Sequence, residues 1–416
     1  MLNDLINKLC PNGVEYLPLW KITIWNKKFN LIESYKQEKV VKFYSISSKN
    51  LKKLLSNFGD VKLLSTGSFD GFTNEKNCIK INNAEVLTLP EGGKANIKYW
   101  NGKFINSLNL IATSANKNLY NLRYIYHFLA YKNELIEANY RGSGIKHPDM
   151  KQILEIPIPI PPLEIQNEIV KILDTFTELT TELTTELTLR KQQYEYYRDA
   201  LLSFDYLCNN KASNNLFKLS TNSRFYKLIN KLCPNGVEYK KLSSCTQLVS
   251  GKGIPKAMMN DSFPYPVIGG GVQHTGKYNN FNFSKSITIS RSGSAGFVNW
   301  INENFWATAS CFVSSQKQDG PNIKFVYFYL KSKENELQKH IYGGGSTVPI
   351  LDKNYLFNFP IPIPPLEIQN EIVNILDNFS TLCDDLTSGL PAEIEMRKKQ
   401  YEYYRDQLLT FNEKKV

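Results

Sequence analysis

Hydrophobic positions follow two different patterns along this chain. From Ile165 to Leu201, apolar side chains recur at every third or fourth residue, which is the spacing of an amphipathic helix. One helix over Leu163–Phe204 would be about 60 Å long, since each residue adds about 1.5 Å. An apolar stripe of that length needs a partner, and a copy of it follows at Leu366–Phe411. The pattern therefore predicts two long helices that pair as a coiled coil.

The rest of the chain favours short strands with a few helices. Its apolar runs are brief, contain many β-branched residues and are bounded by Gly, Pro, Asn and Ser, which is typical of strands. The clearest runs are Glu85–Leu89, Ser286–Ser290 and Phe305–Ser314, and the predicted helices are Leu122–Tyr131 and Ile323–Lys331. Glycine-rich turns occur at Gly67–Gly71, Gly92–Gly93, Gly269–Gly271 and Gly343–Gly345. Such turns let a ligand approach the backbone, although ordinary hairpins explain them as well. The predicted fold class is α+β.

Three blocks of sequence occur twice. They are LINKLCPNGVEY from Leu5 and Leu228, PIPIPPLEIQNEIV from Pro157 and Pro360, and RKQQYEYYRDALLSF from Arg190 with RKKQYEYYRDQLLTF from Arg397. A repeat of this length is the mark of a duplicated structural unit. The chain therefore consists of two halves of the same design.

The segments between the repeated blocks, Leu17–Ile156 and Lys240–Phe359, differ in sequence but share landmarks. Each is large enough for a domain. Thr88, Gly93, Ala95, Trp100 and Tyr140 are matched, in the same order, by Thr288, Gly293, Ala295, Trp300 and Tyr342. We therefore predict one fold that carries two different surfaces. The predicted boundaries are 1–156 and 228–359 for the domains, 157–206 and 360–416 for the long helices, and 207–227 for a linker.

The two predicted helices differ in their middle. Residues 177–188 of the first are three copies of Thr-Glu-Leu-Thr, and each copy would add about 6 Å of helix. The middle of the apolar stripe is expected at Phe176, Leu179, Leu183 and Leu187. The second helix has no such array and contains Gly389 and Pro391, and a proline inside a helix is expected to kink or interrupt it. Because the array lies between two repeated blocks, its copy number sets their separation.

Positive charge is concentrated in the two variable segments. The whole chain has a net charge of +11. Leu17–Ile156 contains 21 Lys and Arg against 11 Asp and Glu, and Lys240–Phe359 contains 13 against 6. The remainder contains 16 against 22 and is acidic. A general preference for lysine codons would load all parts alike, whereas this division indicates that the variable segments face a polyanion.

Motifs for catalysis and metal binding are missing. There is no His-Glu-x-x-His, no Gly-x-Gly-x-x-Gly after a strand, and the four histidines are scattered. Gly271–Lys277 is similar to a phosphate-binding loop, but Tyr278 stands where the magnesium-binding Ser or Thr is needed. Pro148-Asp149 lacks the acidic-x-Lys triplet of the common nuclease core. The sequence predicts a reader with no catalytic residues, metal or cofactor of its own.

Cysteine use and hydropathy bear on the location of the protein. The seven cysteines include no Cys-x-x-Cys pair, which fits free thiols in a reducing compartment. The N-terminus lacks the shape of a signal peptide, and no apolar run is long enough to cross a membrane. We expect a cytoplasmic protein that does not engage the membrane.

Two basic domains, each followed by Ile-Pro-Ile-Pro-Pro-Leu-Glu-Ile-Gln at the start of a long helix, closely resemble the specificity subunits of type I restriction–modification systems. The likeness covers nearly the whole chain, and the Thr-Glu-Leu-Thr array looks like the four-residue repeats of some members. Members often carry Glu-Gln where this chain has Ile165-Gln166 and Ile368-Gln369.

The resemblance implies two α/β target recognition domains related by a pseudo-twofold axis and joined by two antiparallel coiled-coil helices. Each domain would read one half of a split, asymmetric site on double-stranded DNA. The helices would dock two modification subunits, which methylate adenine with S-adenosylmethionine, and two restriction subunits can join. No catalysis and no cofactor would belong to this chain.

Polar and basic residues near the glycine turns are the candidates for DNA contacts, although plain solvated surface explains each of them as well. In the first domain they are Ser47, Lys49, Asn50, Ser68, Lys94, Asn96, Arg141 and Lys146. In the second they are Lys252, Gln273, His274, Lys277, Arg291, Ser292 and Ser294.

Three other interpretations stay open at this point. A stand-alone nuclease or methyltransferase predicts activity from the purified chain, and a repetitive surface protein predicts a secretion signal. An orphan or phase-variable specificity subunit is a nearer alternative, because nearly identical blocks favour recombination.

Overall fold

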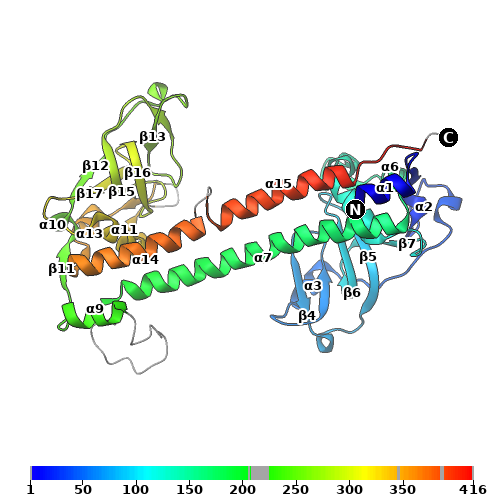
Figure 1. The fold of residues 1–416 in the computed structure, drawn as a ribbon, viewed down its shortest axis with the longest axis horizontal. Coiled ribbons are helices and arrows are strands. Elements are labelled where there is room, and N and C mark those ends of the chain that lie inside the picture. Colours follow the sequence, from blue (N-terminus) through cyan, green and yellow to red (C-terminus); the bar gives the residue numbers. More distant parts are fainter. Residues whose placement is uncertain (1, 205–206, 208–223, 344–346, 385–387, 415–416) are drawn as a thin grey trace. The chain divides into compact units, whose positions relative to one another are not determined.

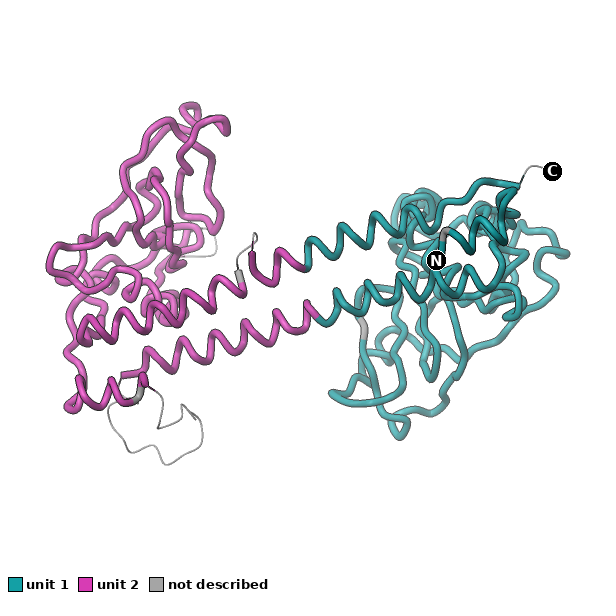
Figure 2. Tube along the Cα trace, in the orientation of Figure 1, with its two compact units in different colours: residues 1–182, 394–416 teal, residues 183–393 magenta. Residues whose placement is uncertain are grey.

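The chain forms two compact units in the computed structural model, which describes residues 2–204, 207, 224–343, 347–384 and 388–414. The first unit is 1–182 with 394–416, and the second is 183–393 (Figure 2). Each unit contains one globular domain and stretches of helix from both halves of the sequence. Most of the predicted linker 207–227 lies outside the described residues. Within the described residues, no helix is long and apolar enough to span a membrane.

The first domain is built on a six-stranded sheet with the order β2-β7-β5-β6-β3-β4 (Figure 1). Its strands are β2 (Thr23–Trp25), β3 (Val61–Leu64), β4 (Asp70–Thr73), β5 (Asn82–Pro90), β6 (Lys98–Asn106) and β7 (Asn109–Ser114). Only β3 and β6 run parallel, and the other neighbours are antiparallel. Helix α4 (Leu122–Tyr131), which matches the predicted helix, buries Tyr124, Ile125 and Leu129.

The second domain repeats this topology, with the order β12-β17-β15-β16-β13-β14. Its strands are β12 (Gln247–Ser250), β13 (Tyr265–Ile268), β14 (Gly276–Tyr278), β15 (Phe283–Ser290), β16 (Val298–Ala307) and β17 (Cys311–Ser315). Helix α11 (Ile323–Ser332) takes the place of α4. The predicted single strand Phe305–Ser314 is wrong, because the Cys311 N–H donates to the Thr308 carbonyl in a turn that separates β16 from β17. The prediction of one fold with two surfaces is confirmed.

The strand registers correct the alignment of two landmarks. Leu87 pairs with Tyr99 and Ile287 pairs with Trp300, and both Leu87 and Ile287 belong to the core that includes the domain helix, so Trp300 corresponds to Tyr99 and not to Trp100. Thr88 and Thr288 come directly after these two residues, so their predicted match is confirmed. Tyr342 pairs in the second position of its strand, where Arg141 stands in the first domain. Tyr342 is therefore the counterpart of Arg141, and the buried Tyr140 corresponds to Ile341. Similar letters at nearly equal spacing misled the alignment by one position.

Short elements complete both domains. In the first they are α1 (Leu2–Leu9), β1 (Glu15–Pro18), α2 (Leu19–Ile22), η1 (Ser34–Gln37), α3 (Ser48–Lys53), η2 (Glu75–Asn77), α5 (Asn133–Glu137), β8 (Tyr140–Arg141), β9 (His147–Pro148), α6 (Met150–Leu154) and β10 (Pro157–Ile160). In the second they are α9 (Arg224–Leu232), β11 (Glu238–Lys241), α10 (Leu242–Cys245), η3 (Lys256–Met258), α12 (Glu334–Gln338), β18 (Ile341–Tyr342), β19 (Ile350–Leu351), α13 (Lys353–Phe357) and β20 (Pro360–Ile363).

The repeated Pro-Ile-Pro-Ile sequence forms a strand in each half. β10 pairs antiparallel with β1, and β20 pairs antiparallel with β11. A proline cannot donate a ladder hydrogen bond, so it is tolerated where only one side of a strand is paired, as in these two-stranded sheets. Ile158 and Ile361 are fully buried, whereas Pro157 and Pro360 at the start of each strand are exposed.

The first closing block forms one unbroken helix, α7 (Leu163–Leu201), which is three residues shorter than predicted. The second forms two helices, α14 (Leu366–Asp384) and α15 (Leu390–Leu408). The expected interruption near Pro391 is therefore confirmed. Pro391 lies in the first turn of α15, where a missing N–H removes no intrahelical hydrogen bond.

The two closing blocks pack antiparallel within each unit. Phe176 of α7 stacks on Tyr404 of α15 in the first unit, with ring centroids 5.3 Å apart. Tyr197 of α7 meets Phe379 of α14 in the second unit, at 5.8 Å. The less exposed positions of α7 are spaced alternately by four and three residues, which is a heptad seam: Phe176, Thr180, Leu183, Leu187, Arg190, Tyr194 and Tyr197. Leu179 is 38% exposed, so its predicted place in the seam is wrong, and Thr180 occupies that place.

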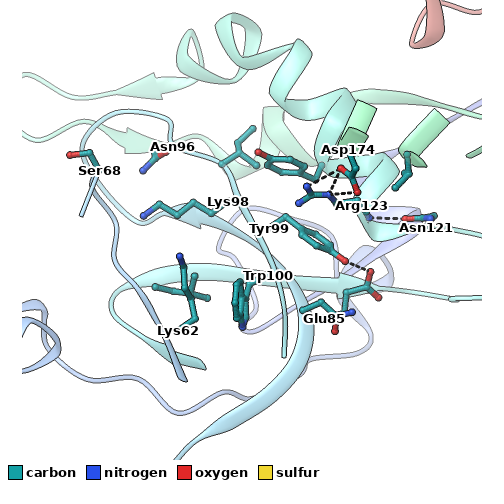
Figure 3. A pocket seen from close by; sticks show the side chains of 15 residues that line it. Lys62, Ser68, Glu85, Asn96, Lys98, Tyr99, Trp100, Asn121, Arg123 and Asp174 are labelled. Atoms are coloured by element: carbon teal, nitrogen blue, oxygen red, sulfur yellow. Dashed lines mark hydrogen bonds and ion pairs between the residues drawn. The ribbon is translucent and has the colours of Figure 1, made fainter. Parts of the chain in front are cut away.

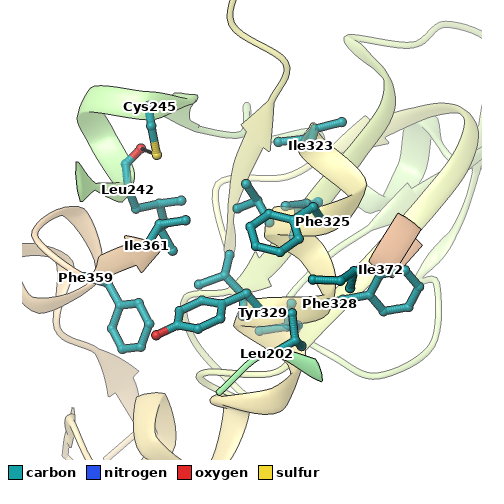
Figure 4. Close-up of a cluster of buried hydrophobic side chains, with 14 of the residues drawn as sticks. Leu202, Leu242, Cys245, Ile323, Phe325, Phe328, Tyr329, Phe359, Ile361 and Ile372 are labelled. Carbon is teal, nitrogen blue, oxygen red and sulfur yellow. Dashed lines mark hydrogen bonds between the residues drawn. The ribbon is translucent and has the colours of Figure 1, made fainter. Parts of the chain in front are cut away.

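The hydrophobic core of each domain includes residues of the long helices. In the second unit, Leu202 beyond the end of α7 and Ile372 of α14 pack with Phe325, Phe328 and the other aromatic side chains of the core (Figure 4). In the first unit, Ile165 and Leu173 of α7 belong to the domain core together with Leu408. Burial of such side chains ties each domain to the helices of its own unit.

Candidate nucleic-acid interface

A buried glutamine joins each domain to the start of its long helix. The side chain of Gln166 has 0% exposure. Its Oε1 accepts a hydrogen bond from the Asn121 N–H at 2.9 Å, and its Nε2 donates to the Pro161 carbonyl at 2.8 Å. Gln369 does the same with the Asn322 N–H and the Pro364 carbonyl, both at 2.7 Å. The glutamines satisfy backbone groups that would be costly to bury without partners.

Two further contacts repeat at the same joint. Asn121 donates to Asn167 at 2.7 Å, and Asn322 donates to Asn370 at 2.9 Å. Two ion pairs join the domain helices to the long helices, Arg123 with Asp174 at 2.9 Å and Lys324 with Asp377 at 2.8 Å. We call these contacts, together with those of Gln166 and Gln369, the two joints. They explain why Glu-Ile-Gln-Asn is repeated although the domains differ.

The loops of the first domain gather around the turn Ser107–Leu108. The Ser107 N–H donates to the Leu64 carbonyl at 3.0 Å, and the Ser107 hydroxyl lies 2.9 Å from the Ser48 hydroxyl. The Glu91 N–H donates to the Leu108 carbonyl at 3.2 Å. These bonds bring the ends of β3, β5 and β6 together with the start of α3.

Other hydrogen bonds extend this assembly. The Gly93 N–H donates to the Lys146 carbonyl at 2.8 Å, and Asn96 Nδ2 donates to the Gly67 carbonyl at 2.9 Å. We define the first loop edge as residues 47–50, 65–69, 91–98, 107–108 and 141–147. Gly93 has a φ of 105°, a conformation that favours glycine, so this turn depends on its residue type.

The second domain builds an equivalent edge around Thr308–Ser310. The Thr308 N–H donates to the Ile268 carbonyl at 2.9 Å, and the Arg291 N–H donates to the Ser310 carbonyl at 2.8 Å. The Ser294 N–H donates to the Gly270 carbonyl at 2.8 Å. We define the second loop edge as residues 251–252, 269–275, 291–297, 308–310 and 347–350. Gly344 and Gly345, part of a predicted turn, lie outside the described residues.

The structure brings all eight candidates of the first domain to the first loop edge. Ser47 caps α3 by accepting from the Asn50 N–H. The exposed ones are Ser47, Lys49, Asn50, Ser68, Lys94, Arg141 and Lys146, while Asn96 is half-buried. Arg141 lies 3.7 Å from the Asp149 carboxylate. Whether these side chains touch DNA stays a prediction.

Six of the seven candidates of the second domain lie on the second loop edge. Lys252, Gln273, His274 and Arg291 are exposed, and Ser292 and Ser294 are half-buried. The exception is Lys277, which lies within strand β14 and pairs with Pro266. The sequence could not place Lys277, because the length of the glycine-rich turn was unknown.

Sequence reasoning missed two residues that organise this region, Gln166 and Lys98. A glutamine between Ile165 and Ile169, on the buried stripe of a helix, was the available signal for the first. Lys98 lies two positions before Trp100, which puts both on one face of β6. This alternation was readable, but the loop that Lys98 contacts comes from a distant part of the sequence.

A cavity of about 800 Å³ extends from the first loop edge to α7 (Figure 3). Ser68, Asn96 and Lys98 line its loop end, and Arg123 and Asp174 line its helix end. The Arg123 guanidinium lies 4.5 Å from the Tyr99 ring centroid and 5.0 Å from that of Tyr126. A cavity of about 500 Å³ occupies the matching place in the second domain, between the Gly271–His274 loop and β16.

Charge at the helix end of the first cavity is balanced internally. Burial lowers the pKa of His127 below 6.5, although its hydrogen bond to Asp174 at 2.8 Å opposes that shift. Burial opposes ionisation of Asp174, but hydrogen bonds from His127 and Arg123 outweigh it and lower the pKa of the carboxyl. Burial, followed by the charge of Glu85, raises the pKa of Tyr99. This end therefore holds a neutral His127 beside the Arg123–Asp174 ion pair, and these contacts stabilise the packing of α4 on α7.

No group of three or more His, Cys, Asp or Glu side chains that could hold a metal ion occurs among the residues that the structure describes. The exposed polar and basic side chains of both domains instead lie on loops carried by a rigid sheet. Such an arrangement suits the binding of an extended, charged ligand.

Comparison with known proteins identifies this arrangement. Residues 24–190 and 234–396 each match the family described as type I restriction modification DNA specificity domain. The chain is 31% identical over 361 residues to the EcoR124I/EcoR124II type I restriction enzyme specificity subunit of Escherichia coli, covering 82% of this chain and 84% of that one. It is 29% identical to the MpnII specificity subunit of Mycoplasma pneumoniae, covering 63% and 92%.

The fold is also similar to a solved S subunit of a type I restriction–modification system from M. genitalium. The TM-score is 0.66, with 96% of this chain and 97% of that chain covered. At 16% identity this similarity establishes the fold alone. The chain belongs to the type I restriction–modification DNA specificity family. Its two domains are DNA specificity domains, and it recognises DNA as a subunit of a restriction–modification assembly.

Proposed function

We propose that each loop edge reads one half of a split and asymmetric DNA site in the major groove. The observation that carries this proposal is the gathering of 14 of the 15 candidate side chains on equivalent edges of two domains. Both domains are basic while the rest of the chain is acidic, so phosphate contacts would position these edges. Because the two edges carry different side chains, the two half-sites should differ in sequence.

The same proposal leaves catalysis to other subunits. The described residues hold no candidate metal cluster, and the sequence lacks the acidic-x-Lys triplet of the common nuclease core. S-adenosylmethionine would be bound by the modification subunit. Since the DNA is the host chromosome, we place the complex in the cytoplasm.

Two modification subunits fit a chain that presents the same block twice. Tyr196 and Tyr403 occupy the same position in the Arg-Lys-x-Gln-Tyr-Glu-Tyr-Tyr-Arg-Asp repeat, and they are 42% and 59% exposed. Exposed aromatic side chains are frequent anchors of protein interfaces. Identical exposed side chains in two halves suit a partner that is present in two copies. Two restriction subunits would join where the system cleaves DNA.

Mapping of methylated bases in host DNA tests the proposal, after co-expression of this chain with the neighbouring modification-type gene. We expect a motif of two unlike halves around an unspecified spacer. Replacing Lys240–Phe359 with the corresponding segment of another member should change one half only. A folded complex with no split motif would contradict the proposal, and methylation without cleavage would identify an orphan subunit.

The Thr-Glu-Leu-Thr array is proposed to set the spacer between the half-sites. Residues 177–188 lie inside the unbroken helix α7, so removal of one unit shortens the helix by about 6 Å. Deletion of residues 181–184 should change the spacer length in the mapped motif and leave both half-sites intact. Replacing these four residues with Ala is the matched control, because it keeps the helix length. A change in the sequence of either half-site would contradict the proposal that the array sets only the spacer length.

A further inference from the structure

Lys98, at the start of β6, has its ammonium group among the carbonyl groups of one loop. Its Nζ donates to the Gly67 carbonyl at 2.7 Å, the Ser65 carbonyl at 3.0 Å and the Phe69 carbonyl at 3.4 Å. The side chain is half-buried and lines the cavity shown in Figure 3. A lysine ammonium has three N–H donors, and these carbonyls, with the Ser65 hydroxyl oxygen at 3.5 Å, surround it with acceptors from a single loop.

Neighbouring side chains hold the same loop from two further directions. Asn96 Nδ2 donates to the Thr66 carbonyl at 3.3 Å and to the Gly67 carbonyl at 2.9 Å. The Ser65 hydroxyl donates to the Phe69 carbonyl at 2.6 Å. Four of the five carbonyl groups of Ser65–Phe69 are therefore bound from within the domain. Ser68, between them, is exposed on the first loop edge.

The second domain holds its equivalent loop by other means. Asn299 is the counterpart of Lys98, since Thr88 pairs with Lys98 and Thr288 pairs with Asn299, and Asn299 is half-buried and lines the second cavity. The loop between β13 and β14 is fixed by backbone bonds, from the Ser294 N–H to the Gly270 carbonyl and from the Thr275 N–H to the Val267 carbonyl, both at 2.8 Å. Among the residues that the structure describes, a lysine whose ammonium group binds the carbonyl groups of this loop therefore occurs in the first domain and not in the second.

We propose that Lys98 is a positioning residue that determines sequence preference at the first half-site without touching DNA. This inference rests on the proposed function of the loop edges. Base reading requires side chains to be placed within about 0.5 Å, and Lys98 fixes the backbone that presents Ser68. The ammonium group of Lys98 is bound to the carbonyl groups of the loop. Lys94, on the same edge, is exposed and can reach a phosphate.

The experiment compares Lys98→Met with Lys94→Met in the complete complex with modification subunits. Binding is measured on the mapped site and on sites with one changed base pair, over a series of salt concentrations. For Lys98→Met, we expect discrimination at the first half-site to fall by about tenfold or more. Discrimination at the second half-site and the salt dependence should be unchanged. Lys94→Met should weaken binding to all sites alike and reduce the salt slope by about 0.9.

Two more variants separate positioning from a general loss of structure. Lys98→Arg keeps a cationic donor and should retain more discrimination than Lys98→Met. Asn96→Ala removes a weaker support of the same loop and should relax the same half-site to a smaller extent, even where Lys98→Met fails to fold.

The outcomes distinguish this inference from the proposed function. If the wild-type complex has no split motif, the proposed function fails. If the wild-type motif is present but Lys98→Met keeps full discrimination, or lowers the salt slope as Lys94→Met does, Lys98 is not a positioning residue.

Discussion

The joints and the loop edges differ in how closely the two halves agree. At the joints, Gln166 and Gln369 make the same bonds, and Arg123–Asp174 corresponds to Lys324–Asp377 with almost the same separation. At the loop edges, the two domains share the arrangement of the backbone but carry different side chains. The joint has to keep one geometry between a domain and a helix, whereas each edge is free to change with its ligand.

The first joint also contains polar groups that the second lacks. The Tyr124 hydroxyl donates to the Pro159 carbonyl at 3.0 Å, and the helix register places Phe325 at its position in the second domain. His127, which bonds to Asp174, likewise corresponds to Phe328. The second joint therefore relies more on apolar packing, and substitutions can test how much the polar groups contribute.

Removal of a joint glutamine should have the largest effect. We expect Gln166→Leu to lower the free energy of unfolding of the first unit by about 2–5 kcal/mol, because the Asn121 N–H and the Pro161 carbonyl would stay buried without partners. Gln369→Leu should cost the second unit a similar amount. Urea denaturation, with hydrogen exchange to assign the loss to a unit, measures both.

Glu164→Gln, on the exposed side of the same helix, is the control and should change stability by less than about 0.5 kcal/mol. If Gln166→Leu is equally neutral, packing alone holds the joint.

Loss of the Tyr124 hydroxyl should have a smaller effect. Tyr124→Phe introduces the residue type of the second domain and should destabilise the first unit by about 1 kcal/mol, the usual worth of one hydrogen bond. Tyr126→Phe, on the same helix but lining the cavity, is the matched control. Equal effects of the two variants would mean that the bond to Pro159 contributes nothing specific. Thermal unfolding followed by circular dichroism suffices for this comparison.

The contrast also explains what the sequence could predict. Helix periodicity located α4, α7 and α11 because a packed helix repeats its apolar positions every few residues. The interruption before Pro391 followed from the missing proline N–H. Duplication predicted one fold for both domains, because two segments with shared landmarks and identical flanks rarely fold differently.

The remaining features depend on contacts between distant residues. The turn at Thr308–Ser310 lies inside an apolar run and has no glycine or proline to mark it. Thr180 replaces Leu179 in the heptad seam because the partner helix decides which face is covered. The sequence does not distinguish Lys98 from the other lysines, because its role depends on contacts with the distant loop Ser65–Phe69. Local patterns therefore located the loop edges but did not distinguish the exposed lysines and arginines from Lys98, which binds the loop backbone.

Acidification should destabilise the first joint but not the second. The pKa of His127 is lowered in the folded first unit by burial, so the unfolded chain binds a proton at higher pH than the folded one. Stability therefore falls as pH drops below 6.5, the usual pKa of histidine. The lowered pKa of Asp174 contributes only near and below its usual value of 3.8, which leaves a window for His127 alone.

Hydrogen exchange in α4 and α11 between about pH 4.5 and 6.5 measures this difference, after correction for the intrinsic exchange rate. Exchange in α4 should increase on acidification, and His127→Phe should abolish the increase. If α11, which carries Phe328, responds equally, His127 is not the cause.

The smallest effect is expected from single exposed cations on the loop edges. Lys146 is exposed, and its contact with Gly93 is made by its backbone carbonyl, so its side chain is not needed to build the edge. Lys146→Met should therefore keep the fold and both half-site sequences, and lower the salt slope of DNA binding by about 0.9. Lys76, an exposed lysine of η2 outside the edge, is the control, and Lys76→Met should leave the slope unchanged. Equal slopes for both variants would mean that DNA is bound by the general charge of the domain, whereas a difference would assign phosphate contact to the loop edge itself.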